Sequence, residues 1–183
     1  MGNRVEILLA GSGGQGLILA GLILAEAAVI HDHKNACQTQ SYGPEARGGA
    51  SKSEVVIDTG EIDYPKVISA DVLMALTQEA CDKYSGELKR DGLLIVDAMY
   101  VDHVPNPRAY KLPITKVAEQ TTGRAITANM VGLGVLAGLT GVVSRQALEA
   151  AVAARAPKGT AEINLKALEA GYRLVAEYRR GGK

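Results

Sequence analysis

Short apolar runs and longer helical stretches alternate along the chain. Runs typical of buried strands cover Val5–Ala10, Ser53–Ile57, Asp71–Leu76 and Leu93–Asp97, and a more polar candidate strand covers Asn35–Gln40. Helical character extends over Leu17–Ile30, Gln78–Leu88, Thr127–Leu139, Ser144–Arg155 and Thr160–Arg180. This alternation predicts an α/β fold in which a mostly parallel, Rossmann-like sheet carries helices on both faces. We expect one three-layer domain over residues 1–183.

Turn-forming residues separate these elements. The Asp-Gly pair at 91–92 predicts a turn before the next strand. Three prolines make 102–113 an extended connection, with a short edge strand around Ala109–Leu112. Ser144 and Thr160 are of the residue types that cap helix N-termini, so each is expected to start a helix.

The last part of the chain carries two patterns that bear on packing. Glycines at 132, 134, 138 and 141 interrupt the helix predicted at Thr127–Leu139. Glycine inside a helix costs about 1 kcal/mol relative to alanine, so these glycines indicate that another backbone or another chain packs very close. In the final helix an apolar stripe is expected to pack against the sheet; it consists of Leu165, Leu168, Tyr172 and Val175.

A glycine-rich loop, Gly11-Ser12-Gly13-Gly14-Gln15-Gly16, joins the first predicted strand to the first predicted helix. Glycine permits positive φ there, and the N–H groups at a helix N-terminus favour negative charge. The spacing matches the dinucleotide-binding fingerprint. However, the second strand ends in Gln40 rather than in the acidic residue that would hold a ribose. NAD or FAD is therefore not expected here, and no Gly-Lys-Ser/Thr follows to make a P-loop.

A second glycine-rich segment runs from Ser41 to Gly49 and reads Ser-Tyr-Gly-Pro-Glu-Ala-Arg-Gly-Gly. Glycine and proline constrain it as a surface loop around Glu45 and Arg47. Two interpretations stay open. The two charged residues form a local ion pair or helix cap, or Arg47 offers its planar guanidinium to a carboxylate or phosphate of a ligand or partner.

Polar residues follow two of the predicted strands. Ligands gather at the carboxyl ends of parallel strands, so this edge is expected to bring together the Gly11 loop, Thr77-Gln78 and Asp97. Asp97 is also of a residue type that is common in turns, where it caps the segment that follows. This structural interpretation is the favoured one. Asn129, at the start of a predicted helix, is either a structural cap or part of an interface.

Composition excludes several classes of protein. Twenty basic and 20 acidic residues give no net charge, which offers no electrostatic case for binding nucleic acid or an anionic membrane. The two cysteines, Cys37 and Cys81, are too far apart in sequence for an iron–sulfur motif. His31 and His33 are expected in a solvated turn, because further metal ligands are missing at useful spacing. Without a signal or membrane-spanning pattern, a cytoplasmic location is expected.

The two glycine segments together resemble a known family. With Ser53-Glu-Val-Val-Ile57, they are similar to the gamma subunit of 2-oxoacid:ferredoxin oxidoreductases. The resemblance runs nearly end to end, through Asp71–Gln78, Asn129–Gly134 and Lys158–Leu165. The amino-acid sequence of the second segment is most similar to that of the 2-oxoglutarate branch, also called 2-oxoglutarate synthase. The pyruvate branch more often has phenylalanine before Gly-Pro-Glu.

The resemblance implies an enzyme that oxidatively decarboxylates a 2-oxoacid, forms an acyl-CoA and passes electrons to ferredoxin. Thiamine diphosphate, Mg²⁺ and [4Fe-4S] clusters are then expected on partner subunits, with CoA as co-substrate and no cofactor bound by this chain alone. The expected partners are the alpha and beta subunits, which bind thiamine, and a ferredoxin-type delta subunit. Two alternatives remain: another 2-oxoacid as substrate, either branched-chain, indolepyruvate or pyruvate, or a freestanding nucleotide-binding module. The isolated chain could also pair with itself.

The sequence does not identify which residues of this chain, if any, are catalytic. Lys52 is a second positive charge close to Arg47, which could serve CoA phosphates or a substrate carboxylate, or simply face solvent. The candidate contacts with ligands or partners are Gly11, Ser12, Gly13, Gly14, Gln15, Gly16, Ser41, Tyr42, Gly43, Pro44, Glu45, Arg47, Gly48, Gly49, Lys52 and Asn129. No metal ligand is expected among them.

Overall fold

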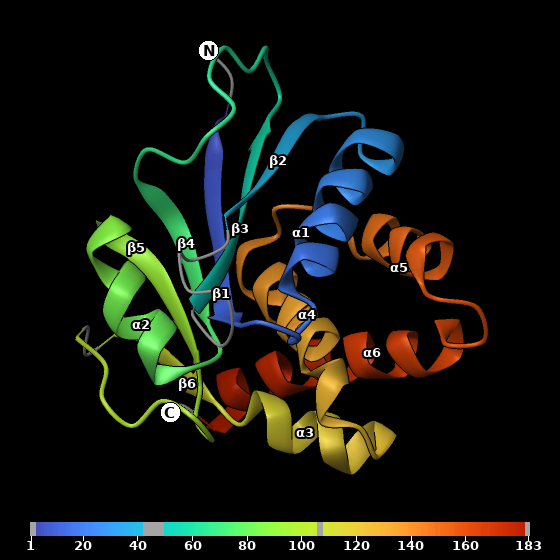
Figure 1. Ribbon diagram of the computed structural model, residues 1–183. Helices are drawn as coiled ribbons and strands as arrows, with labels where there is room; N and C mark the ends of the chain where they lie inside the picture. The colour runs from blue at the N-terminus through green and yellow to red at the C-terminus, as the bar shows by residue number, and fades with distance from the viewer. Residues whose placement is uncertain (1–2, 42–49, 106–107, 182–183) are drawn as a thin grey trace.

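A six-stranded sheet in the order β2-β3-β1-β4-β5-β6 forms the middle of the computed structural model, which describes residues 3–41, 50–105 and 108–181 (Figure 1). The strands are β1 (Val5–Ser12), β2 (Asn35–Ser41), β3 (Ala50–Asp58), β4 (Ala70–Ala75), β5 (Leu88–Asp97) and β6 (Tyr110–Leu112). Strands β1, β4, β5 and β6 pair in parallel, whereas β3 is antiparallel to both of its neighbours, β1 and β2. The expected mostly parallel α/β sheet is confirmed, with β3 as the exception.

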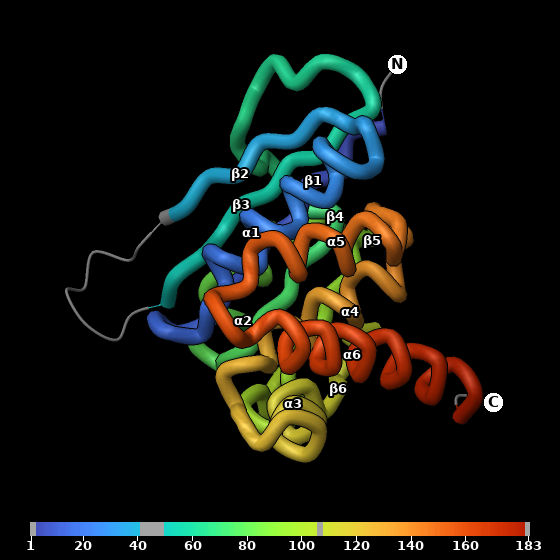
Figure 2. Tube along the Cα trace, turned by 90° about the vertical axis from the view of Figure 1, so that its right-hand side faces the viewer, coloured from blue at the N-terminus to red at the C-terminus, as the bar shows by residue number. Residues whose placement is uncertain are grey.

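Helices cover the two faces unequally. One face carries α1 (Leu17–Glu26), which continues as a π-helical turn at Ala27–His31, together with α4 (Ala128–Thr140). Helix α5 (Arg145–Arg155) packs on α1, on this turn and on α6 (Ala161–Gly181). Outside α1 and α4 lie α6 and α3 (Ile114–Thr122), as Figure 2 shows. The other face carries α2 (Gln78–Tyr84) and a short 3-10 turn at Ser85–Glu87. The main core therefore lies between the sheet and the layer of α1 and α4, and it extends to the helices packed outside them.

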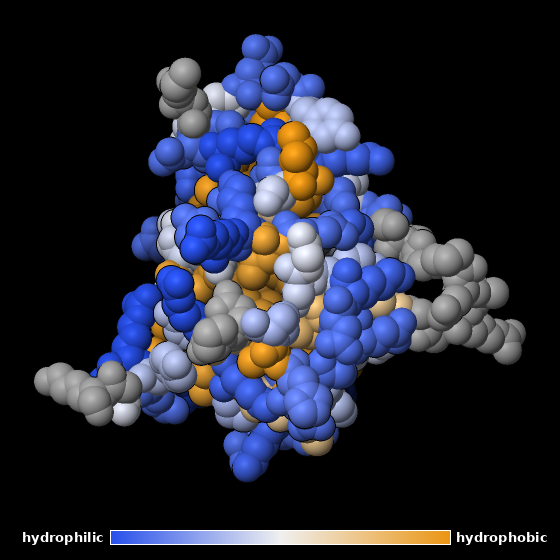
Figure 3. Space-filling model, turned by 90° about the vertical axis from the view of Figure 1, so that its left-hand side faces the viewer, coloured by the Kyte–Doolittle hydropathy of each residue, from blue (hydrophilic) through white to orange (hydrophobic). Residues whose placement is uncertain are grey.

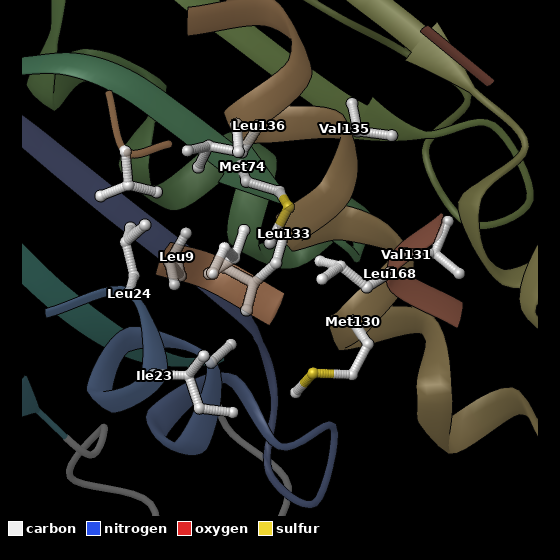
Figure 4. Close-up of a cluster of buried hydrophobic side chains, with 14 of the residues drawn as sticks. Leu9, Ile23, Leu24, Met74, Met130, Val131, Leu133, Val135, Leu136 and Leu168 are labelled. Carbon is white, nitrogen blue, oxygen red and sulfur yellow. The ribbon is translucent and has the colours of Figure 1, made fainter. Parts of the chain in front are cut away.

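Side chains from five elements meet in this main core. Leu9 of β1 and Met74 of β4 face Leu24 of α1 and Leu133 of α4, and Leu168 of α6 closes the cluster (Figure 4). All five are at most 1% exposed. Burial of this kind is worth about 2 kcal/mol for each large aliphatic side chain, so the cluster fixes α1 and α4 on the sheet.

The second face is only partly covered. Figure 3 shows apolar side chains in a strip between polar surfaces on this side of the molecule. Val67, Leu88 and Val104 are partly buried against the core under α2, and the neighbouring Ile68 is 72% exposed. Some apolar surface on this side therefore stays in contact with solvent.

The glycines of α4 serve packing within the chain. A Cβ added at Gly134 would lie 2.2 Å from the carbonyl oxygen of Leu168, and one added at Gly171 would lie 2.1 Å from that of Val131. Helices α4 and α6 thus cross with their backbones in contact at these two glycines. Gly141 ends α4 with φ 64°. The close neighbour inferred from the sequence is confirmed as another backbone, but it belongs to α6 of the same chain.

Two expectations for single elements were wrong, and one helix was not predicted. The pair 91–92 forms no turn, because β5 begins at Leu88 and passes through it with a shift in its pairing to β4. Helix α3 was not predicted, although it begins after Pro113 and ends at Gly123 in the left-handed conformation. The apolar stripe of α6 packs mainly against α4 rather than against the sheet, because α4 lies between them.

The two predicted caps differ. Ser144 caps α5, since its hydroxyl accepts a hydrogen bond from the N–H of Ala147 at 3.2 Å. Thr160 directly precedes α6, but its hydroxyl donates to the carbonyl of Pro157 at 2.7 Å. Thr160 therefore holds the turn before α6 rather than the helix's own N–H groups.

Candidate functional site

The Gly11 loop lies at the carboxyl end of β1 and is shaped by its own side chain. Gln15 turns back so that its Oε1 accepts a hydrogen bond from the N–H of Ser12 at 2.8 Å. A Cβ at Gly11 would lie 2.1 Å from that oxygen, so glycine at this position leaves room for the glutamine. Gly14 and Gly16 have φ of 89° and 72°, which other residues rarely adopt. The loop is thus a fixed turn that presents backbone groups.

Asn129 ties this loop to α4. Its Nδ2 donates to the carbonyl of Gly16 at 3.1 Å, and its Oδ1 accepts from the N–H of Met130 at 2.8 Å. The side chain is buried against Gly16, where an added Cβ would lie 2.5 Å from Nδ2. Asn129 therefore connects the starts of α1 and α4 within the chain, which favours its structural role.

Asp97 fixes the turn after β5. Its carboxylate is fully buried and accepts hydrogen bonds from the N–H of Met99 at 3.1 Å and from the N–H of Thr115 at 3.0 Å. The hydroxyl of Thr115 also donates to it. Asp97 thereby holds both the turn that carries Tyr100 and the first turn of α3, so the structural interpretation of this residue is supported.

These elements surround a cavity of about 330 Å³ at the carboxyl edge of the sheet. Its lining includes Gly13, Gly14, Gln15, Tyr100, Thr115 and Ile126. Tyr100 and Ile126 are 45% and 53% exposed, and Met99 beside them is 49% exposed. Backbone groups on one side and apolar surface on the other suit the binding of a ligand or a partner. Among the described residues the lining offers backbone N–H groups, an amide, two hydroxyls and apolar side chains, which suit binding and orientation.

Thr77 and Gln78 do not join this cavity. Thr77 caps α2 by accepting from the N–H of Ala80 at 3.3 Å. The amide of Gln78 holds the backbone of the 101–104 segment, since Oε1 accepts from Asp102 and His103 and Nε2 donates to the carbonyl of His103. The expectation that they lie beside the Gly11 loop is confirmed, because the N–H of Leu76 donates to the carbonyl of Ala10 at 2.9 Å and α2 packs against β1. Their own hydrogen bonds nevertheless build the fold rather than the cavity.

Lys52 lies on β3 and is ion-paired. Its Nζ lies 3.0 Å from Oε1 of Glu54 and 2.9 Å from Oε2 of Glu87, and 5.2 Å from the centre of the Tyr84 ring. Burial disfavours the charged amine, but the hydrogen bonds and charges of Glu87 and Glu54 outweigh burial and raise the pKa of Lys52. Lys52 therefore connects β3 to the turn after α2, and its charge is already partnered.

The second glycine segment connects β2 to β3 at the same edge. Ser41 pairs with Lys52, and Ala50 pairs with Ser12 at the end of β1. Helix α2 anchors Ala50, whose N–H donates to Glu79 at 3.2 Å and whose carbonyl accepts from the hydroxyl of Tyr84 at 3.4 Å. Tyr42, Gly43, Pro44, Glu45, Arg47, Gly48 and Gly49 lie outside the described residues. The Ala50 end of the segment is therefore next to the Gly11 loop, whereas the Ser41 end is one strand further away, on β2.

The histidine pair flanks a structural aspartate. Asp32 accepts hydrogen bonds from the N–H and the hydroxyl of Ser144, each at 2.6 Å. Burial alone would raise the pKa of Asp32. The hydrogen bonds from Ser144 and the charges of Lys34 and His31 outweigh burial, so the pKa of Asp32 is lowered. Within the described ranges no group of three or more His, Cys, Asp or Glu is placed to hold a metal ion. No helix in that part of the chain is long and apolar enough to span a membrane.

Comparison with known proteins places the chain in a family. Residues 6–174 match the family described as pyruvate ferredoxin/flavodoxin oxidoreductase. The chain belongs to this family. It is 50% identical over 178 residues to the 2-oxoglutarate synthase subunit KorC of Methanocaldococcus jannaschii, with 95% of each protein covered.

Two further comparisons concern a solved structure and a more distant relative. A crystal structure of the gamma subunit of a keto/oxoacid ferredoxin oxidoreductase from Geobacter sulfurreducens superposes with a TM-score of 0.87 at 50% identity. It covers 96% of this chain and 98% of that one. The ketoisovalerate oxidoreductase subunit VorA of Methanothermobacter marburgensis is 36% identical over 92% of this chain, but the match covers only 36% of VorA. The fold matches that of an oxidoreductase gamma subunit.

The sequence analysis missed several residues that line the cavity. Tyr100 stands three positions after Asp97, and the rule that ligands gather at strand ends could have found it. Thr115 and Ile126 carry no comparable signal, because Thr115 lies in the unpredicted helix α3 and Ile126 in a 3-10 turn at Ala125–Thr127. They reach the cavity only through the packing of α3 and α4.

Proposed function

We propose that the chain is the gamma subunit of a cytoplasmic 2-oxoglutarate:ferredoxin oxidoreductase. This enzyme converts 2-oxoglutarate and CoA to succinyl-CoA and CO2 and passes the electrons to ferredoxin. The observation that carries the proposal is 50% identity over 95% of both proteins to a 2-oxoglutarate synthase subunit. The relative named for ketoisovalerate is only 36% identical, which favours 2-oxoglutarate over a branched-chain substrate.

In this proposal the chemistry is completed by other subunits. Thiamine diphosphate and Mg²⁺ lie on the alpha and beta subunits, and the iron–sulfur clusters lie there or on a ferredoxin-type delta subunit. Two cysteines in the whole sequence are too few to ligate a [4Fe-4S] cluster by cysteine alone. The gamma chain would then contribute binding surface and positioning rather than electron transfer.

The surface proposed for this role is the carboxyl edge of the sheet. It combines the cavity beside Gly13 and Gly14 with the exposed apolar side chains of Met99, Tyr100 and Ile126. Large exposed apolar side chains gathered around a cavity are typical of interaction sites. The subunit thus docks on the thiamine-binding chains through this edge and shapes the entrance for CoA and the 2-oxoacid.

The function is tested with the assembled enzyme. The chain is co-expressed with its alpha, beta and delta partners, and CoA-dependent reduction of a viologen dye is measured with 2-oxoglutarate, ketoisovalerate, pyruvate and indolepyruvate. A parallel preparation omits this chain. We expect activity that prefers 2-oxoglutarate and is lost on omission. Equal turnover without the chain, or a preference for another 2-oxoacid, would contradict the proposal.

Arg47 tests how the second glycine segment contributes. If it contacts a partner, Arg47→Ala lowers the yield of the complex, whereas a ligand contact raises KM for CoA or for 2-oxoglutarate selectively. Lys52→Ala is the matched comparison, because Lys52 is already paired with Glu54 and Glu87. We expect it to reduce the stability of the chain while leaving both KM values unchanged. If Arg47→Ala changes neither the yield of the complex nor the KM for CoA or 2-oxoglutarate, Arg47 contacts neither a partner nor a ligand.

A further inference from the structure

A second hollow lies beside the candidate site, where three distant segments meet. It is a groove of about 180 Å³ between the start of α1, the link from α3 to α4 and the start of α6. Figure 2 shows these segments side by side. Leu19, Met130, Pro157 and Ile163 provide an apolar lining, and Ile126 belongs to both this groove and the cavity. The groove is thus an apolar continuation of the carboxyl-edge surface.

The charge at this groove is mainly positive, since the nearby Glu162 is paired with Lys166 at 2.9 Å. Arg124 lines it, and Lys158 lies in the turn directly after Pro157. Both side chains are exposed, and within the described ranges neither forms an ion pair with a carboxylate. None of the described residues that line the groove is acidic. By contrast, Lys52, Lys89, Arg145 and Arg155 are each paired with a carboxylate of this chain. Lys66 and Arg90 are likewise exposed and form no ion pair within the described ranges, so what distinguishes Arg124 and Lys158 is their position beside an apolar groove.

We propose that this groove docks an acidic segment of a partner subunit, with an aliphatic side chain inserted into the groove and carboxylates placed against Arg124 and Lys158. The proposal rests on the proposed function, because it needs an assembled enzyme. The carbon-rich lining favours a protein segment over a free phosphate, which has no apolar part to bury. Opposite charges would set the orientation of docking, while the buried aliphatic side chain supplies affinity.

Charge reversal in the co-expressed complex tests the groove. The variant Arg124→Glu/Lys158→Glu is compared with Lys66→Glu/Arg90→Glu, which changes the net charge equally at exposed residues away from the groove. We expect the groove variant to lower the amount of chain that co-purifies with its partners about tenfold or more, whereas the control stays near wild type. Far-UV circular dichroism checks that both variants are folded. The milder Arg124→Gln/Lys158→Gln variant should show a smaller loss in the same direction.

A carbodiimide cross-link tests the contact itself. This reagent joins an amine to a carboxylate only when the two are in contact, so Lys158 should form a cross-link to an Asp or Glu of a partner subunit, identified by mass spectrometry. Lys158→Arg keeps the charge but removes the amine; we expect normal assembly and loss of that cross-link. A cross-link from Lys158 to this chain alone would overturn the proposal.

The outcomes separate this inference from the function. If the charge-reversed complex assembles normally but its KM for CoA rises, the groove binds a small anion and the docking proposal is wrong. If reversal changes neither assembly nor KM, the groove has no role in the complex, while the proposed function stands on the omission assay. If the control variant loses assembly equally, net charge rather than this groove governs association.

Discussion

At the scale of single residues, the glycines between α4 and α6 set how closely these helices approach. Gly134→Ala would place a Cβ 2.2 Å from the Leu168 carbonyl oxygen, so the helices must separate. We expect the free energy of unfolding to fall by roughly 1–3 kcal/mol, measured by chemical denaturation.

Gly138→Ala is the matched control on the same helix. Its Cβ would meet only side-chain atoms of Tyr172 and Val175, at 3.3 Å. The gain in helix propensity, about 1 kcal/mol, offsets this tight contact, so the change should be close to neutral. If both variants lost the same free energy of unfolding, the contact between the two helix backbones at Gly134 would not explain the loss.

Glu6 makes the stability of the chain depend on acid pH. One carboxylate oxygen accepts from Nε of Arg4 at 2.7 Å, and the other accepts from the N–H groups of Ile68 and Ser69 at 2.6 and 2.9 Å. Burial raises the pKa of Glu6, but these hydrogen bonds and the charge of Arg4 together lower it below the ordinary 4.5. The ionised form is thus favoured in the folded chain. Glu6 therefore contributes fully to the free energy of unfolding at pH values above its pKa in the unfolded chain. This contribution is lost as the pH falls through its pKa in the folded chain.

Glu6→Gln tests this dependence. The amide cannot ionise, so the variant should be less stable than wild type near neutral pH, and the difference should shrink as pH falls below 4.5. Urea denaturation at several pH values gives both curves. A difference that stays constant down to the most acidic pH would show that Glu6 contributes through packing and not through its charge.

At the scale of elements, Asp97 joins β5 to α3. Asp97→Ala would leave the N–H of Thr115 and the N–H of Met99 without their acceptor in a buried site. We expect a loss of about 2–3 kcal/mol in unfolding free energy, together with faster amide exchange in Ile114–Thr122. Thr115→Val removes only the hydroxyl, so it should cost less. Unchanged exchange in α3 after Asp97→Ala would contradict this connection.

The hydrophobic pattern predicts most elements but not all of them. Buried runs such as Val5–Ala10 stand out because both faces of a central strand are covered, and β1 indeed extends from Val5 to Ser12. Helix α3 is only nine residues long. Its start also depends on a hydrogen bond that the N–H of Thr115 donates to the distant Asp97, which the local pattern does not show. The antiparallel direction of β3 cannot be read from the sequence, because alternation is the same in both directions.

The candidate site was predictable only in part. The Gly11 loop carries its own signal, since glycine spacing reflects local φ values. The pairing of Lys52 with Glu54 could have been predicted, because residues two apart on a strand share a face. Its second partner, Glu87, comes from the turn after α2, and Tyr100 and Ile126 meet only in the folded chain. Local chemistry was thus predictable, whereas long-range neighbours were not.

At the scale of the whole molecule, the two ends of the sheet differ. The carboxyl edge gathers the Gly11 loop, the ends of the second glycine segment, the cavity and the groove beside Arg124. The opposite end holds the connection between β3 and β4, which the side chain of Arg4 fixes through the carbonyls of Tyr64 and Lys66. The function of the chain in a complex is therefore expected at one end of the sheet.

Amide hydrogen exchange of the free chain and of the assembled enzyme tests this central claim most directly. We predict slower exchange in the complex for Ser12–Leu19, Met99–Val101 and Arg124–Met130, with little change in the 59–69 connection at the opposite end. Protection confined to that connection or to the outer surface of α6, with the carboxyl edge unchanged, would contradict the account.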